Sequence, residues 1–207
     1  MSHIGPLVVV VDIGCGIGRD HEAHREDYNP GLFSTAMPKG LKQTSSSLAI
    51  GFNATETGAN TFTQAQVDLN LDPLNREVFV VQSINLDPYT PDVNAGTTSS
   101  VACSLTSTSQ TAVQTLANSN CMAASANLIR MGAGSVEGVP FQTGFFETPT
   151  AMGLEYIGII ATNDFFVQVK GTGNTAAKQV DGKLYGYRAI ASADIYAALV
   201  QSEVLSA

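Results

Sequence analysis

Charged residues are scarce in this chain of 207 residues, where Asp, Glu, Lys and Arg make up 14% of the sequence against roughly 25% in a typical globular protein. A surface with so few charges is either covered by neutral polar side chains or buried against partners, and we favour burial against partners. The ten Lys and Arg residues are scattered and the net charge is −8. This balance argues against direct contact with a phosphate backbone.

Cysteine is also scarce, with Cys15, Cys103 and Cys121 spread widely along the chain. An odd number at this spacing excludes a disulfide framework and a zinc-binding pattern. Cys103 and Cys121 could pair if neighbouring strands bring them together, but we favour buried thiols, because a free cysteine behaves as a small apolar side chain.

Long hydrophobic runs are missing, so the sequence predicts no membrane-spanning segment. The apolar run at residues 7–11 is too short for a signal peptide, has no cationic start and is followed directly by Asp12. We therefore expect synthesis in the cytoplasm without export, and we treat the glycosylation sequon at Asn53 as coincidental.

What the chain does contain is a series of β-prone segments, most clearly in its last third. Residues 154–160, 165–169 and 183–188 are rich in aromatic and β-branched side chains, which favour strands. Alternation puts Phe165, Val167 and Val169 on one face, and a turn is predicted at residues 171–174. We expect these three strands to form one antiparallel sheet at the end of the chain, with edges that must be paired or protected.

Further strands are predicted at residues 48–52, 61–71, 77–86 and 101–105, and a short helix is predicted after Ser192 as N-cap. About eight short strands separated by turns predict an all-β fold, a β-sandwich of the jelly-roll type. The expected division is an extended N-terminal arm over residues 1–31 and a sandwich domain over residues 32–207.

Residues 97–129 carry no charge in 33 positions, and thirteen of these are Ser or Thr. The first half alternates as a strand does, whereas residues 110–129 suggest a short helix or a polar loop. The apolar residues spaced through the segment favour an ordered structure over a disordered linker.

A glycine-rich stretch after the first apolar run resembles the first motif of S-adenosylmethionine-dependent methyltransferases. In that family the glycines let a cofactor lie against the backbone, which would assign the cofactor loop to Gly14, Gly16 and Gly18. The motif belongs at the start of a helix within alternating strands and helices, but the rest of this chain has an all-β pattern. We therefore interpret the stretch as a bend in the arm and predict no cofactor-binding residue.

His21 and His24 are three residues apart, with Glu26 and Asp27 nearby, and on a helix they could share a metal ion. No further Cys or His follows at ligand spacing, so a solvated charged turn is the expected role. No nucleophile elbow or phosphate loop is found. The sequence thus predicts no catalytic residue, no metal site and no small-molecule substrate.

This combination of strands, neutral connections and an N-terminal arm resembles the coat proteins of icosahedral viruses, over about residues 45–190. The resemblance implies a capsid subunit that assembles with copies of itself in a virion made in the host cytoplasm, and other coat proteins are further candidate partners. The arm is net acidic, whereas many such coats have a basic arm, so no direct nucleic-acid contact is expected. The implied contact regions are residues 1–31, 97–129 and 141–146.

The alternative is an extracellular or surface β-sandwich that builds filaments or mediates adhesion, with residues 60–71 as a strand added to a neighbour. A methyltransferase is the third and most remote reading of the sequence.

Overall fold

The computed structural model describes residues 38–131, 141–145 and 155–205. The predicted arm lies outside these ranges, as do Cys15, the three motif glycines and the pair His21 and His24. The division into an arm and a sandwich domain therefore stays a prediction.

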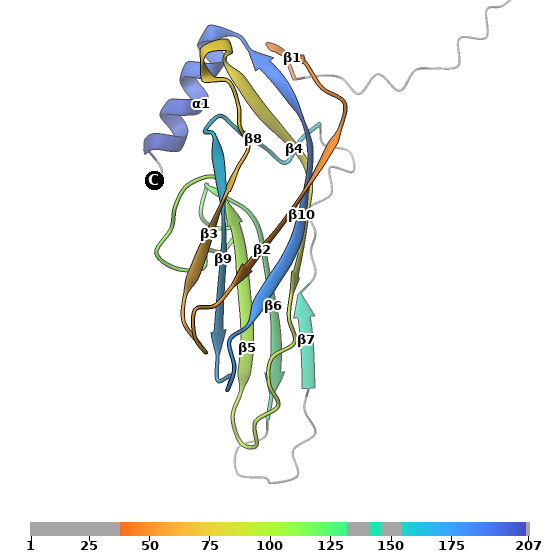
Figure 1. Ribbon diagram of the computed structural model, residues 1–207, viewed down its shortest axis with the longest axis vertical. Helices are drawn as coiled ribbons and strands as arrows, with labels where there is room; N and C mark the ends of the chain where they lie inside the picture. Colours follow the sequence, from red (N-terminus) through yellow and green to blue (C-terminus); the bar gives the residue numbers. More distant parts are fainter. Residues whose placement is uncertain (1–37, 132–140, 146–154, 206–207) are drawn as a thin grey trace, which may run out of the picture. The chain divides into compact units, whose positions relative to one another are not determined.

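The described residues form two antiparallel sheets of five strands each and one α-helix near the C-terminus (Figure 1). The elements in chain order are β1 (Leu41–Gln43), β2 (Leu48–Thr55), β3 (Thr63–Asp68), the 3₁₀ helix η1 (Pro73–Asn75), β4 (Glu77–Pro88), β5 (Ser99–Thr106), β6 (Cys121–Arg130), β7 (Phe141–Phe145), β8 (Gly158–Ile160), β9 (Asp164–Thr172), β10 (Gln179–Ala191) and α1 (Ala193–Leu205).

The strand pairing is that of a jelly roll. Strands β2 and β10, β3 and β9, β4 and β8, and β5 and β6 form the successive antiparallel pairs of one long ribbon. Rolling the ribbon brings β10 beside β4 and β9 beside β5, which closes one sheet on each side of the core. In addition, β1 extends the sheet of β10, and β7 extends the sheet of β6. The predicted all-β sandwich is confirmed.

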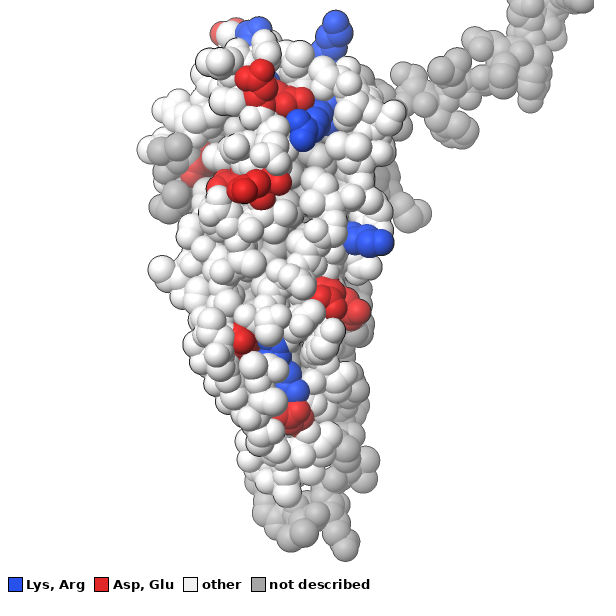
Figure 2. Space-filling model, in the orientation of Figure 1, with Lys and Arg blue, Asp and Glu red and all other residues white. Residues whose placement is uncertain are grey.

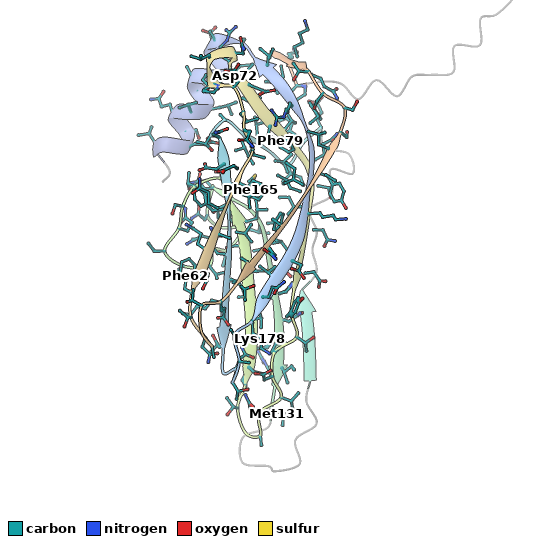
Figure 3. The ribbon with its side chains drawn as sticks, in the orientation of Figure 1. Phe62, Asp72, Phe79, Met131, Phe165 and Lys178 are labelled. Atoms are coloured by element: carbon teal, nitrogen blue, oxygen red, sulfur yellow. The ribbon has the colours of Figure 1, made fainter. Side chains whose placement is uncertain are left out.

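The core between the sheets is built from alternate residues of their strands. Phe165, Val167 and Val169 are fully buried in it, as the alternation predicted. Phe165 meets the ring of Phe52 edge to face, with centroids 5.6 Å apart, and Figure 3 shows Phe79 and Phe165 among the side chains of this core. Strands β2 and β9, which are far apart in the sequence, thus contribute to one apolar layer.

The predicted single sheet at the end of the chain is wrong. Strands β8 and β10 belong to one sheet and β9 to the other, because each of these connections crosses between the two layers of the roll. The first of the three segments is also shorter than predicted, since its strand covers only Gly158–Ile160.

The helix or loop predicted over residues 110–129 is wrong in its second half. Residues 107–120 connect β5 to β6, and Cys121–Arg130 is a ten-residue strand. Its two faces carry similar small side chains, such as buried Ala123 and half-buried Ala124. Hydrophobic alternation, the main sequence signal of a strand, is therefore weak here.

The predicted C-terminal helix is confirmed and begins directly after Ser192. Ile195, Tyr196, Leu199 and Val200 of α1 pack against a second apolar cluster that includes Val78 and Val80 of β4. In the described ranges, no helix is long and apolar enough to cross a membrane.

Candidate assembly surfaces

The uncharged segment 97–129 is described throughout, and alternate residues of its strands, such as Val101 and Leu105, face the core. It supplies β5, β6 and the 107–120 loop between them. Charged side chains are sparse and scattered over the side of the molecule seen in Figure 2. We call the outward side of β5 and β6 together with this loop the neutral face.

A buried polar cluster holds the 107–120 loop onto the neutral face. At its centre is Gln168 of β9, which points away from the apolar core yet has no exposed surface. Its Oε1 accepts a hydrogen bond from Ser104 Oγ at 2.7 Å, and its Nε2 donates to Thr106 Oγ1 at 2.7 Å and to Gln64 Oε1 at 3.1 Å. Buried amides are stable only when paired in this way, so the cluster requires the loop to cover it.

The loop backbone is tied to the same side chains. Gln110 N donates to Gln64 Oε1 at 2.8 Å, and Gln114 N donates to Ser104 Oγ at 3.0 Å. Thr106 Oγ1 in turn donates to the Thr108 carbonyl at 2.7 Å. Strands β3, β5 and β9 thereby fix the path of a loop that has no regular secondary structure of its own.

The end of the loop presents an apolar side chain beside a hollow. A turn closed by Asn118 N and the Thr115 carbonyl, 3.0 Å apart, carries Leu116, whose exposed fraction is 59%. The adjoining hollow has a volume of about 350 Å³. Its lining comes from β5, β6 and the loop: Ala102, Cys103, Val113, Gln114, Thr115, Ala124, Ser125 and Ala126.

A second polar cluster joins three loops at the end of the sandwich where Lys178 lies in Figure 3. Glu56 is buried, and its carboxylate accepts hydrogen bonds from Gly171 N at 2.6 Å and Lys178 N at 2.8 Å. The turn predicted at residues 171–174 begins later, because β9 runs to Thr172, and the chain reverses over residues 173–178. It opens with Gly173 at φ +69°, a conformation that favours glycine. The carboxylate thus links the end of β2 to the connection between β9 and β10.

Asn174 and Asp92 extend this cluster to the third loop. Asn174 exchanges hydrogen bonds with Asn60 and accepts one from Asp92 N at 2.9 Å. The hydrogen bond from Lys178, followed by those from Thr175, holds the pKa of the Asp92 carboxyl well below its ordinary value. These loops are held together by a network of paired polar groups, of which Glu56 and Asn174 are buried, and such networks make a structure more rigid.

Two sheet edges lack the usual protection against pairing with another chain. In the described part of the chain, β2 pairs only with β10 and β7 only with β6. Neither Leu48–Thr55 nor Phe141–Phe145 contains a charged residue or a proline, the features that commonly protect free edges.

The thiols of Cys103 and Cys121 are free and buried, which confirms the favoured prediction. Burial raises the pKa of Cys103 to about 12 and also raises the pKa of Cys121. A thiol with a raised pKa forms little of the nucleophilic thiolate. Both side chains therefore serve packing.

Chemistry-bearing groups do not converge elsewhere in the described ranges, where no three His, Cys, Asp or Glu side chains lie close enough to hold a metal ion. The sequence did not identify Gln168, Glu56 or Leu116 as important. The available signal was Gln168 itself, a long amide between Val167 and Val169 in the apolar centre of β9.

Comparison with known proteins adds little. No protein-family model matches the sequence, and no curated protein matches it. A solved structure from Desmodium yellow mottle tymovirus is similar over 76% of this chain and 95% of its own, with 12% identity and a TM-score of 0.29. A likeness at this level carries no argument, so the jelly-roll assignment rests on the strand pairing alone.

Proposed function

We propose that this protein is a structural coat subunit that assembles with copies of itself into a closed, symmetric shell. The observation that carries the proposal is the neutral face, which lies within a run of 33 consecutive uncharged residues on a chain of net charge −8. Copies of an acidic protein repel each other, so close contact between them is favoured where the surface has no charge.

The fold supports a structural role. Its loops are fixed by buried polar clusters around Gln168 and Glu56, and a rigid subunit loses little conformational freedom when it assembles. We extend the proposal to a place in a virion, with no direct contact to nucleic acid, no catalytic activity and further coat proteins as possible partners.

A filament or adhesion protein is the second candidate, and the free edge of β2 favours it. Strand addition from a neighbour would satisfy the open hydrogen-bonding groups of Leu48–Thr55 without opposing charge. This mode would give open, fibrous assemblies, whereas the shell requires interfaces that close.

The test is to express the full chain and examine it by analytical ultracentrifugation and negative-stain electron microscopy over a range of concentrations. Rings or closed shells support the coat subunit, and fibres support the second candidate. A monomer at every concentration would contradict both. Titration with S-adenosylmethionine should give no heat, and a saturable signal would return the glycine motif to consideration.

A further inference from the structure

We infer that the neutral face is the contact between two copies of this chain related by a twofold axis, with Leu116 of each copy seated in the hollow of the other. This inference rests on the proposed self-assembly and specifies its first step. Three observations carry it: Leu116 is exposed on an ordered loop, a hollow lies beside it, and few charges border the neutral face.

Leu116 is exposed on an ordered support. The turn that carries it is closed by a backbone hydrogen bond, and the loop is tied to β5 through Gln114 and Ser104. A flexible loop could fold such a side chain against its own surface, but this one keeps Leu116 59% exposed. Leu116 is thus already positioned for a partner, and little ordering entropy is lost on binding.

The hollow is shaped to receive an apolar side chain. Ala102 and Ala126 are opposite each other in the register of β5 and β6, and Ala124 follows beside them. With Val113 of the loop they line a space of about 350 Å³. Any larger residue in place of these alanines would fill it. Leu116 follows directly after Thr115, which lines the hollow, so Leu116 and the hollow lie side by side on one copy. Under a twofold axis, Leu116 of each copy can therefore enter the hollow of the other.

The charges identify a second copy as the occupant. At a twofold axis identical residues meet, so a carboxylate near the axis would face its own counterpart. Residues 97–129 contain none. Among the described residues, the exposed or strand-end charges at the border of the face are Lys170, opposite Ala102, and Arg130 at the end of β6. Glu203 of α1 also borders the loop, but its carboxylate is buried and accepts hydrogen bonds from Ala161 N and Thr162 N. A basic partner would therefore find no carboxylate on this face.

The acidic residues on the outward side of the same sheet lie away from the proposed axis. Asp68 and Asp164 are opposite each other in the register of β3 and β9. These two strands lie on one side of β5, and β6 lies on the other. An acidic partner would gain only the two border cations, Lys170 and Arg130. A neutral surface such as the same face of a second copy fits best.

The test compares Leu116→Asp with Leu74→Asp in the full chain. Leu74 is 92% exposed and lies in η1, outside the neutral face, so it matches the chemistry of the change at another site. Sedimentation equilibrium should show the dimer dissociation constant raised by about 30-fold or more for Leu116→Asp, the size expected for a central apolar anchor. Leu74→Asp should leave it within about threefold, since isolated surface changes have small effects.

Intermolecular crosslinking gives a direct second measurement. In a Cys15→Ser background, chains carrying Leu116→Cys are mixed with chains carrying Ala126→Cys under mild oxidation, with a mass tag on one of them. The expected product is a mixed disulfide dimer. Cys103 also lines the hollow, so the same mixture is repeated with Cys103→Ala in both chains, which shows that the disulfide forms at position 126; Cys121 is buried and outside the lining.

The outcomes separate the two proposals. If the wild type assembles while Leu116→Asp assembles equally well, or no mixed dimer forms, the twofold contact is wrong and the coat proposal stands on another interface. If the wild type remains a monomer, both are overturned. Loss of association in Leu116→Asp alone, together with the mixed dimer, supports the inference.

Discussion

Replacing Gln168 with Leu should release the 107–120 loop. The substitution keeps a similar side-chain volume but removes three hydrogen bonds, those with Ser104, Thr106 and Gln64. Each contributes ~0.5–1.5 kcal/mol, so the free energy of unfolding should fall by about 2–4 kcal/mol. That is a large share of the ~5–15 kcal/mol that stabilises an ordinary domain.

Two measurements check this prediction. Urea denaturation gives the loss in free energy, and amide hydrogen exchange reports on the backbone N–H groups of Gln110 and Gln114, which donate to the same cluster. Their protection should fall before that of the core strands. The matched control is Gln66→Leu on neighbouring β3, because Gln66 is exposed and bonds to surface carboxylates.

The reasoning would be refuted if Gln168→Leu cost less than ~0.5 kcal/mol, the range of an ordinary surface change. Unchanged exchange at Gln110 and Gln114 would refute it equally, since the loop would then be held by something other than the cluster. If the prediction holds, self-association should weaken as well, because Leu116 would no longer be held in place.

Three further predictions concern other buried groups. Glu56→Ala leaves the buried N–H groups of Gly171 and Lys178 without their partner, so urea denaturation should show a loss of about 2–5 kcal/mol. Cys103, whose pKa burial raises to about 12, should react with iodoacetamide at pH 8 only after denaturation. Burial raises the pKa of Glu203, so the folded state binds its proton more tightly and stability should increase as the pH falls from 7 towards 5.

Each of these has a matched comparison. Thr55→Ala, an exposed change beside Glu56, should cost little, and an equal loss in both variants would contradict the role of the carboxylate. Rapid labelling of native Cys103 would show that the thiol is accessible. For Glu203, the pH slope should become smaller in Glu203→Gln, with a remainder from Asp164, whose pKa burial also raises, and an unchanged slope would assign it to other groups. Near pH 4 and below, protonation of Asp92, whose pKa is lowered, acts in the opposite direction and limits the useful window.

Strands could be predicted from the sequence wherever one face is apolar and the other is not. The alternation of Phe165, Val167 and Val169 gave their burial correctly because strand periodicity is a local property. The assignment of β8, β9 and β10 to different sheets could not be predicted in the same way. It depends on pairings between residues far apart in the sequence, such as Phe79 with Ile160 and Lys183 with Gly51, and no local pattern encodes them.

The candidate site was predictable in outline. A long uncharged segment marked residues 97–129 as unusual, but the sequence does not say that its loop folds back over its own sheet. That geometry depends on Gln168 meeting Ser104 and Gln64, which come from three strands. The shape of the hollow likewise depends on Ala102 and Ala126 being opposite each other, which only the register reveals.

The choice of neutral over charged groups connects the fold to the proposed assembly. Salt bridges could have fixed the loop on the neutral face, as Lys178 and Asp92 help to do at the end of the sandwich. Across a twofold axis, a carboxylate on that face would lie near the same carboxylate of the other copy, and their repulsion would weaken each contact between subunits. Amides and hydroxyls avoid this problem, because once paired and buried under the loop, as Gln168 is, they leave no net charge at the surface. For the self-association that we propose, a buried amide cluster holds the loop without placing charge in the contact, whereas ion pairs would not. The proposed assembly thus offers a physical reason for the absence of charge in residues 97–129.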